Sequence, residues 1–432
     1  MIRRHLTPYR MNHLEIDFCG VHLRNPFLLA AGPATAYRDL IIRGLEMGWA
    51  GAVTKTICQD KDLPKHVANR FGCLPSPNPK MDSCLRRNDT KEWESIPTEK
   101  ECRQYYGLEN IELISDRCAG DWFQDLKAIA KKCPDRLLIA SIMAGGNDSE
   151  GWKWLARECQ EAGVGMLELN LSCPHGMPEK GMGSVIGQDA ELAAQVTRWV
   201  AEEVSIPVMV KLTPNVTDIS EVAKAVVEGG AQAVSAINTV GAVMGVDLET
   251  LSPIPTIKGY STSGGLSGPA VKPIALKAVS SIAKSVSVPI SGMGGIANGW
   301  DAAEFMLLGA QTVQLCSTVM FKGFGVIQEL TDTLSRFMEK HGFLTLEEMV
   351  GKSLPKLVEF RKLDVEWRVV AVVNRKTCIN CEKCYVSCKE AGFQAISMDA
   401  KKYPVIDEKL CTGCGLCVQV CPVEDCIRMS ER

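Results

Sequence analysis

Three features are missing from the sequence, and each absence excludes a class of protein. No apolar run approaches the roughly 18 residues that a membrane-spanning helix needs. Lys and Arg are dispersed and the formal net charge is only -3, so there is no basic stripe of the kind that neutralises nucleic-acid phosphates. The basic residues 1–10 are not followed by the apolar core of a signal peptide. We therefore expect a cytoplasmic protein without a membrane or nucleic-acid partner.

A dinucleotide-binding loop is also missing, because no G-x-G-x-x-G follows an expected strand and opens a helix. We therefore expect no nicotinamide-binding domain within this chain. What is present is a large apolar content, since 46% of the 432 residues are hydrophobic and 23% are charged. Such a chain can bury one large core and a small additional domain, which excludes a disordered or fibrous protein.

Nineteen cysteines are present, and eight of them form two tight runs near the C-terminus. Each run has the spacing C-x2-C-x2-C-x3-C, which is typical of bacterial ferredoxins with two 4Fe-4S clusters. In a reducing compartment such runs indicate metal rather than disulfides. The two runs are Cys378, Cys381, Cys384, Cys388 and Cys411, Cys414, Cys417, Cys421.

In this pattern the first three cysteines of a run hold one cluster and the fourth reaches the other. We therefore assign Cys388 to the cluster of the second run and Cys421 to that of the first. Two structural zinc sites are the alternative, although zinc is normally held by two C-x2-C pairs. Cys426 lies outside the pattern and is expected to be an ordinary buried thiol.

Upstream of the cysteine runs, eight short segments rich in Val, Ile and Leu alternate with helical patterns. This composition is typical of parallel strands that are covered on both faces. Eight such units in about 300 residues match a TIM (β/α)8 barrel better than an open sheet. The expected strands are residues 27–31, 52–57, 137–143, 166–172, 207–213, 233–239, 289–295 and 312–318.

The predicted fold is thus α/β, with a small C-terminal two-cluster ferredoxin-like α+β domain. We place the barrel at residues 1–345, a linker at 346–372 and the ferredoxin-like domain at 373–432.

Two helix starts support the barrel. Asp218 with Glu221, and Asp301 with Glu304, have the spacing of a capping box, and glycine follows each helix. The first of these helices should bury one face, made of Ile219, Val222, Ala223 and Val226.

The ends of the expected strands carry polar residues, where a TIM barrel builds its active site. A single lysine there is often a solvated loop residue, but two lysines and two asparagines together indicate a site. These residues are Lys55, Asn170, Ser172, Lys211, Asn238 and Thr239.

Glycines end the seventh strand, and Ser317 and Thr318 follow the eighth. Gly294 and Gly295 before a helix fit the anion site that barrels place after strands seven and eight, although a packing turn would look the same. Beside iron-sulfur clusters, the natural phosphate-bearing cofactor is FMN.

Residues 169–177, LNLSCPHGM, resemble the catalytic loop of the dihydroorotate and dihydropyrimidine dehydrogenase family. With the ferredoxin-like tail attached in this order, the chain resembles the pyrimidine-site subunit of NAD-dependent dihydropyrimidine dehydrogenases over nearly its whole length. Further matching segments are TKT at 54–56, NIELIS at 110–115, KLTPNVTD at 211–218, NT at 238–239, GGLSGPA at 264–270 and KPIAL at 272–276.

The resemblance implies a reversible reduction of the 5,6 double bond of uracil or thymine, with FMN in the barrel. It implies FMN contacts from Ala31, Lys55, Thr56, Asn170, Lys211, Gly268, Gly294, Gly295, Ser317 and Thr318. It implies pyrimidine contacts from Asn110, Asn170, Leu171, Ser172, Asn238 and Thr239.

Cys173 is implied to be the catalytic acid, which gives a proton to C5 while C6 receives a hydride from the flavin N5. A thiol suits this role because it is mostly protonated at neutral pH. Lys211 near the N1–C2=O edge of the flavin would stabilise the reduced ring. His175 stands where orotate-reducing relatives carry asparagine, so it favours uracil or thymine.

A separate flavoprotein subunit that binds FAD and NAD(P)H is the expected partner, which makes the protein a hetero-oligomer. Electrons from this partner would pass through the two clusters to FMN. Two alternatives remain, a dihydroorotate dehydrogenase and a non-catalytic electron-transfer module that merely holds FMN.

One segment does not fit the resemblance. Residues 73–95, within a polar stretch at 58–109, match no part of the family, and we interpret them as a disordered loop insertion. Its position leaves the substrate preference open.

Overall fold

The computed structural model describes residues 14–75, 105–174 and 177–432. It divides into two compact units, which meet in the sequence between Lys356 and Leu357. The first unit is the barrel and the second is the ferredoxin-like unit. In the described part of the chain, no helix is long and apolar enough to cross a membrane.

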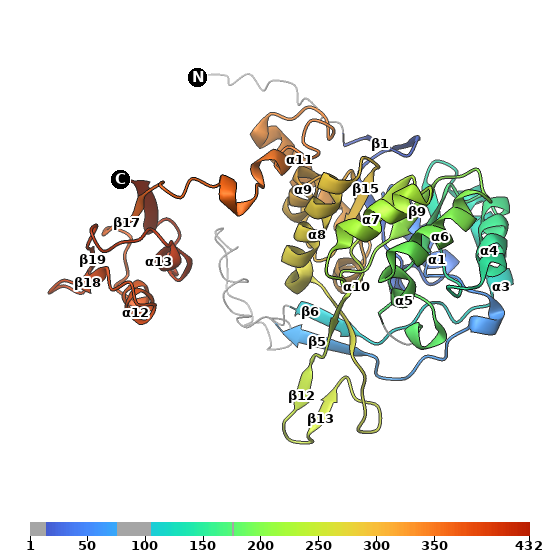
Figure 1. Ribbon diagram of the computed structural model, residues 1–432, viewed down its shortest axis with the longest axis horizontal. Helices are drawn as coiled ribbons and strands as arrows, with labels where there is room; N and C mark the ends of the chain where they lie inside the picture. The colour runs from blue at the N-terminus through green and yellow to red at the C-terminus, as the bar shows by residue number, and fades with distance from the viewer. Residues whose placement is uncertain (1–13, 76–104, 175–176) are drawn as a thin grey trace, which may run out of the picture. The chain divides into compact units, whose positions relative to one another are not determined.

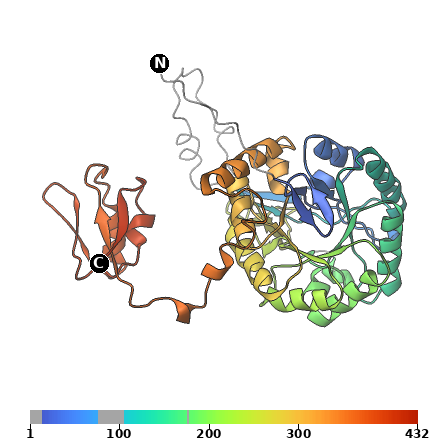
Figure 2. The ribbon, with the colours of Figure 1, turned by 90° about the horizontal axis from the view of Figure 1, so that it is seen from above.

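Eight parallel strands close into a barrel in the order β10-β15-β16-β3-β4-β7-β8-β9. Figure 2 looks onto this barrel and shows helices in a ring around the strands. All eight strands expected from the apolar runs are present, which confirms the TIM barrel. They are β3 Phe27–Leu29, β4 Gly51–Val53, β7 Leu137–Ile142, β8 Met166–Asn170, β9 Val208–Lys211, β10 Ala233–Ala236, β15 Ile290–Met293 and β16 Thr312–Leu315.

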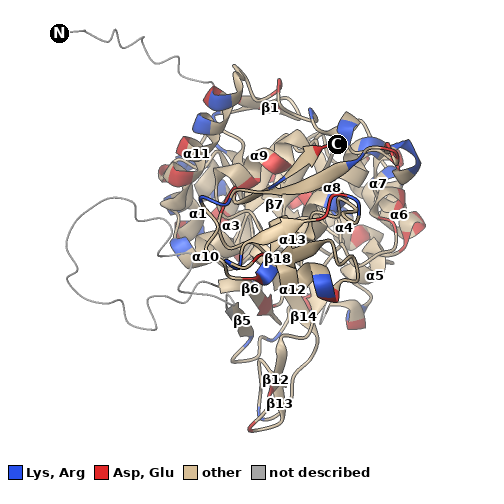
Figure 3. Cartoon of the chain, turned by 90° about the vertical axis from the view of Figure 1, so that its left-hand side faces the viewer, with Lys and Arg blue, Asp and Glu red and all other residues tan. Residues whose placement is uncertain are grey.

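A helix follows each barrel strand in the described residues, and Figure 1 labels these helices. Both basic and acidic residues occur on the outer helices, coloured blue and red in Figure 3. The helices are α1 Arg38–Glu46, α3 Ala119–Lys132, α4 Ser149–Glu161, α6 Ala190–Ala201, α7 Ile219–Glu228, α8 Lys272–Ser285, α9 Gly299–Leu307 and α11 Val326–His341, with the short α5 Ser184–Gly187 and α10 Ser317–Lys322 beside the strand ends.

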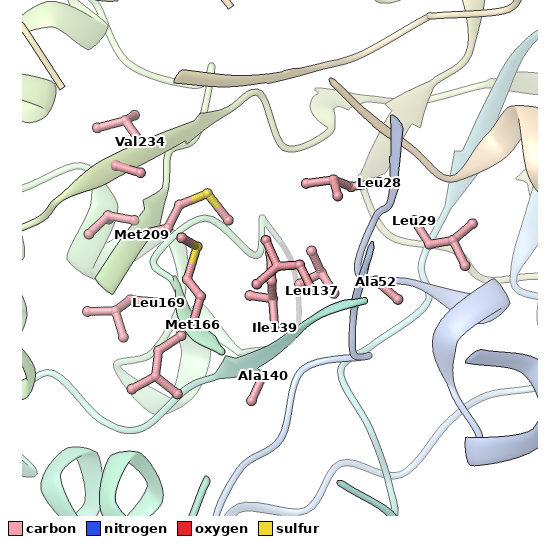
Figure 4. Packing of buried hydrophobic residues seen from close by; sticks show 14 of the residues in the cluster. Leu28, Leu29, Ala52, Leu137, Ile139, Ala140, Met166, Leu169, Met209 and Val234 are labelled. Carbon is pink, nitrogen blue, oxygen red and sulfur yellow. The ribbon is translucent and has the colours of Figure 1, made fainter. Parts of the chain in front are cut away.

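The core lies both inside the barrel and between its strands and helices. Figure 4 shows buried side chains such as Leu28, Ile139 and Met166 packed against one another from different strands. Burial on both faces explains why these strands are continuous apolar runs in the sequence.

Helix α7 follows its sequence signals closely. Its buried side chains are Ile219, Val222, Ala223 and Val226, the face expected from the periodicity. The carboxylate of Asp218 caps the helix by accepting a hydrogen bond from the Ser220 amide at 2.9 Å.

Helix α9 differs from its prediction. Asn298 is the N-cap, and its side chain accepts hydrogen bonds from the amides of Trp300 and Asp301. Asp301 lies inside the first turn and forms an ion pair with Lys272 instead. An asparagine caps a helix as well as an aspartate does. The prediction from the Asp301–Glu304 spacing therefore placed the start of the helix at the wrong residue.

Two insertions build an antiparallel sheet over the carboxyl ends of the barrel strands. We call this sheet the roof; its order is β11-β14-β6-β5. β5 (Phe71–Pro75) and β6 (Tyr105–Asn110) come from the insertion after β4, and β11 (Val240–Ala242) and β14 (Gly264–Ser267) from that after β10. A separate hairpin, β12 Gly245–Asp247 with β13 Ser252–Ile254, extends from the second insertion, and β1 Ile16–Phe18 pairs with β2 Val21–Leu23.

The expected loop at 73–95 therefore begins inside a strand, because residues 73–75 belong to β5. Residues 76–95 lie outside the described residues.

The ferredoxin-like unit, residues 357–432, contains two antiparallel strand pairs and two helices. The expected linker at 346–372 differs at both ends, because Leu346 and Met349 are buried in the barrel core and β17 begins at Val369. The elements are β17 Val369–Val373 paired with β20 Ile427–Glu431, β18 Ile396–Met398 paired with β19 Pro404–Ile406, α12 Lys383–Glu390 and α13 Leu416–Gln419.

Candidate functional site

A cavity lies at the carboxyl ends of the barrel strands, beneath the roof. Every barrel strand except β7 contributes lining residues, and the roof adds Phe71, Leu108, Asn110 and Leu266. The sequence-predicted residues that line it are Ala31, Lys55, Thr56, Asn110, Asn170, Cys173, Lys211, Asn238, Thr239, Gly294, Gly295, Ser317 and Thr318.

Two buried lysines point positive charge at this cavity, and each has a carboxylate. Lys55, just after β4, forms an ion pair with Glu112, which also pairs with Arg70. Lys211, the last residue of β9, lies 3.9 Å from Oε1 of Glu168. Glu112 lines the cavity, whereas Glu168 is fully buried and lies outside the lining.

A chain of hydrogen bonds joins the polar strand ends. The Asn170 amide donates to Oγ1 of Thr56 at 2.8 Å, and Ser172 Oγ donates to Oδ1 of Asn170 at 2.9 Å. The Asn238 amide donates to Ser172 Oγ at 2.9 Å, and its Oδ1 accepts from the Thr239 amide. Because each group holds the next, the side chains that face the cavity have defined orientations before any ligand binds.

Cys173 lies on the loop that leaves β8, where it is 6% exposed and lines the cavity. Its carbonyl accepts a hydrogen bond from the Ser184 amide at 3.0 Å. Gly183 packs against the same residue, and a Cβ there would come 2.8 Å from the Cys173 carbonyl oxygen. The glycine, with φ of +65°, therefore allows the loop to close tightly behind the thiol.

The opposite end of the cavity is lined by small residues and backbone. Gly295 has φ of +80°, and a Cβ there would lie 2.8 Å from the Gly268 carbonyl oxygen. Ser317 and Thr318 begin α10 on the other side. Backbone amides and hydroxyl groups without bulky side chains are suited to a phosphate group.

These features fit FMN. One part of the lining consists of small residues that suit the phosphate. Another part contains Lys55, Lys211 and Asn170, which suit the polar ring system of the flavin. The residues that would hold FMN are therefore those beside Gly294 and Gly295, those at the start of α10, and the two lysines.

Three predicted residues do not line the cavity. Leu171 and Ser172 are completely buried, and Ser172 reaches the site only through its bonds to the two asparagines. Gly268 lies behind the lining, although its neighbour Ser267 is part of it. His175 lies outside the described residues, so its position stays a prediction.

The eight cysteines of the ferredoxin-like unit gather around two further cavities. Cys378, Cys381, Cys384 and Cys421 line one of them. The other is lined by Cys388, Cys411, Cys414 and Cys417. The fourth cysteine of each run thus lies with the first three of the other run, which is the crossed arrangement expected of a two-cluster ferredoxin.

Four thiols around a space fit the donor set of a 4Fe-4S cluster. They surround this space instead of converging on one point, and in the parts of the chain that the structure describes, no three His, Cys, Asp or Glu converge as ligands of a single ion. Cys426 lines the first of the two cavities as well, and its thiol lies 3.8 Å from the Asn374 carbonyl oxygen.

Sequence reasoning missed several groups at the barrel site. Glu112 and Gln314 line the cavity, and Glu168 lies behind it. Glu168 stands two residues before Asn170 on the same strand, so its side chain points to the same side of β8. The sequence signal that could have identified Glu168 is its charge within an otherwise apolar strand.

Burial changes the pKa of two groups near the site. It raises the pKa of the Cys316 thiol, which therefore stays neutral. Burial, with Lys55 beside it, lowers the pKa of His66, a side chain that is 10% exposed and lies 3.9 Å from Glu112. His66 is consequently neutral at pH 7 next to the Lys55–Glu112–Arg70 group.

Comparison with known proteins gives two matching family models. The family described as dihydroorotate dehydrogenase matches residues 13–338, and the 4Fe-4S dicluster domain matches residues 371–429. The two matches correspond to the two units of the structure.

Individual relatives match over most of their length. The NAD-dependent dihydropyrimidine dehydrogenase subunit PreA of Escherichia coli is 36% identical over 97% of this chain and 95% of its own. The chloroplastic NADP(+) dihydropyrimidine dehydrogenase of Arabidopsis thaliana is 39% identical over 79% and 77%. The catalytic subunit of dihydroorotate dehydrogenase B (NAD(+)) from Methanothermobacter thermautotrophicus is 36% identical over 78% and 97%.

Proposed function

We propose that this chain, which belongs to the dihydroorotate and dihydropyrimidine dehydrogenase family, reduces the 5,6 double bond of uracil or thymine as the pyrimidine-site subunit of a dihydropyrimidine dehydrogenase. The observation that carries the proposal is the cavity in which a buried thiol, Cys173, shares the lining with three asparagines and two lysines. The dicluster domain in the same chain supplies a route for single electrons.

The asparagines are assigned to the pyrimidine ring. Each amide nitrogen has two hydrogens and gives one to the protein: Asn110 to the Gly265 carbonyl, Asn170 to Thr56 and Asn238 to Ser172. The second hydrogen of each amide is the donor that we assign to the ring carbonyl groups. Because the first hydrogen fixes the amide plane, the ring is held in one orientation.

Cys173 is the proposed acid of the reaction. FMN, when bound, supplies two electrons and a hydrogen to C6 of the ring. The thiol of Cys173 holds a proton in the buried lining and delivers it to C5. The reverse reaction returns that proton to the thiolate.

The charges of the cavity support a neutral pyrimidine over orotate. Lys55 and Arg70 already pair with Glu112, and Lys211 lies beside Glu168. Each of these cations therefore already lies beside a carboxylate, with Lys55 and Arg70 sharing Glu112. The carboxylate of orotate would need a cation that is not already paired in order to offset the cost of leaving water.

The electrons are proposed to arrive from a separate flavoprotein subunit that binds FAD and NAD(P)H. The E. coli relative is itself named as a subunit. The eight cysteines then hold two 4Fe-4S clusters between that partner and the FMN of the barrel.

The decisive experiment is an anaerobic assay of the purified protein with a chemical reductant against uracil, thymine, orotate and 5,6-dihydrouracil. Reduction of uracil or thymine, with oxidation of dihydrouracil in reverse, is expected. Turnover of orotate alone would identify a dihydroorotate dehydrogenase, and no turnover of any compound would leave a non-catalytic module.

Replacing Cys173 with alanine should lower uracil turnover by about 10²- to 10⁴-fold, the usual contribution of a positioned acid. FMN and iron contents should stay unchanged. Cys58→Ala is the matched control, because Cys58 is also buried but does not line the cavity. Undiminished uracil reduction by the Cys173→Ala protein would disprove the assignment of the acid.

A further inference from the structure

We infer that Glu168 is the counter-charge of Lys211 and thereby a positioning residue that lowers the reduction potential of the flavin, a conclusion that rests on the FMN site proposed above. Glu168 touches neither the cavity nor any ligand in it. Its effect on a group in the cavity is therefore indirect, and the charged lining residue beside it is Lys211.

The two oxygens of the Glu168 carboxylate differ in their hydrogen bonds. Its Oε2 accepts hydrogen bonds from Ser235 Oγ at 2.9 Å and from the Gln314 amide at 3.3 Å. Its Oε1 has no hydrogen-bond partner among the described residues, and it lies 3.9 Å from Nζ of Lys211. The residue is completely buried, so bulk solvent does not reach this oxygen.

The barrel register explains this arrangement. Lys211 on β9 pairs with Asn170 on β8 and with Ser235 on β10. Ser235 therefore lies beside Lys211 and bonds to Glu168, the residue two positions before Asn170. Three adjacent strands thus place one carboxylate directly behind the lysine that lines the cavity.

A buried carboxylate is costly unless a cation or hydrogen bonds compensate it. Lys211 is the cation nearest to Glu168, and its own side chain is only 6% exposed. Within a low-dielectric interior the two charges interact strongly, and a group in the cavity experiences their sum. Glu168 therefore reduces the positive charge that Lys211 presents to FMN.

The second lysine provides a contrast. Glu112, the partner of Lys55, lines the cavity and also pairs with Arg70. A substitution of Glu112 would change the surface that a ligand touches. The Glu168→Gln substitution changes the charge behind the lining, replaces no lining residue and keeps an oxygen that can accept the hydrogen bond from Gln314.

The test is the midpoint potential of FMN in the full-length holoprotein with Glu168→Gln, measured in an anaerobic redox titration with reference dyes. FMN-depleted protein supplies the cluster spectrum that is subtracted. FMN gains negative charge on reduction, so an uncompensated Lys211 should favour the reduced form. The ratio of the dissociation constants of oxidised and reduced FMN should rise at least about tenfold, which corresponds to a shift of about 30 mV to more positive potential for two electrons.

Glu109→Gln is the matched control. Glu109 is also completely buried, but it accepts hydrogen bonds from the backbone amides of Met244 and Gly264 in the roof and does not line the cavity. This control should keep the original potential. An unchanged or more negative potential in the Glu168→Gln protein would overturn the inference.

A second measurement covers the case in which Glu168→Gln does not fold. Lys211→Met removes the cation, so the FMN-depleted full chain should melt at a lower temperature because the Glu168 carboxylate is left uncompensated. An unchanged melting temperature would show that the two charges are not coupled and would overturn the inference.

The failure of this inference differs from that of the proposed function. If the unaltered protein binds no FMN, both fail. If the unaltered protein binds FMN and reduces uracil, but the Glu168→Gln substitution leaves the midpoint potential of FMN unchanged, only the inference fails.

Discussion

The barrel unit and the ferredoxin-like unit differ in what their cores are made of. Side chains from every barrel strand and from the surrounding helices form the core of the barrel. The ferredoxin-like core has six buried residues, and three of these are cysteines: Cys384, Cys417 and Cys426. Two of the three are also expected cluster ligands. The barrel can therefore hold its site by packing alone, whereas the ferredoxin-like unit needs its iron in order to have a core.

The largest expected difference between the two units is their response to the removal of iron. After chelation under anaerobic, reducing conditions, amide exchange in β17 and β20 should accelerate at least about a hundredfold, because the structure that depends on the metal is lost. Strands β8 and β9 should keep their protection. Hydrogen exchange followed by mass spectrometry resolves both regions, and equal protection of β17 and β20 with and without iron would remove the difference on which the comparison depends.

The crossed ligands give the next largest effect. Cys388→Ser alters the first run but should disturb the cluster held by Cys411, Cys414 and Cys417, because these four residues line one cavity. We expect the loss of up to about four iron atoms per chain, together with a change in that cluster's EPR signal.

Cys426→Ser is the control for this substitution, and it should keep the full iron content. Disturbance of the cluster held by Cys378, Cys381 and Cys384 instead would show that each run binds its own cluster.

In the barrel, a single lost hydroxyl should affect binding without unfolding the protein. Ser172→Ala breaks the link between Asn170 and Asn238, so the KM for uracil should rise about tenfold, the equivalent of one hydrogen bond. Ser280→Ala removes another buried hydroxyl, on α8, which donates to the Lys277 carbonyl. Steady-state kinetics should find no change in that control. An unchanged KM for Ser172→Ala would mean that the side-chain amides of Asn170 and Asn238 keep their orientation without Ser172.

The smallest expected effect is a pH dependence of barrel stability. Burial and Lys55 lower the pKa of His66 below 6.5, while Glu112 and Asp116 oppose this and Arg70 adds to it. The unfolded chain therefore binds the proton more readily, and the stability that neutral His66 provides is lost as the pH falls below about 6.5.

Melting curves of the unaltered protein and of His66→Gln should coincide at pH 8 and diverge below pH 6.5, with the unaltered protein losing more. Parallel curves throughout would show that His66 does not titrate in this range.

Much of this architecture is readable from the sequence because its causes are local. A strand buried on both faces must be apolar along its length, so the eight barrel strands were predictable. The buried face of α7 was predictable from the helical spacing of its apolar residues. The spacing of the eight cysteines likewise reflects one compact loop for each cluster.

The rest depends on residues that are distant in the sequence. The roof strand β6 reads Tyr-Tyr-Gly-Leu-Glu-Asn and has no alternation, because its partners are β5 and β14 rather than a single buried face. Glu168 looks like an isolated charge in an apolar strand until Lys211, 43 positions later, is placed beside it. Pairings of this kind are set by the barrel register, which a one-dimensional pattern does not contain.

The roof has a consequence for engineering. Asn110, from the insertion after β4, pairs with Gly265, from the insertion after β10, and also with Phe71. The two insertions are thus halves of one hydrogen-bonded sheet, and exchanging one without the other would leave unmatched edges. A variant with a new substrate range should transplant residues 58–113 and 240–268 together, as a single cassette on an unchanged barrel.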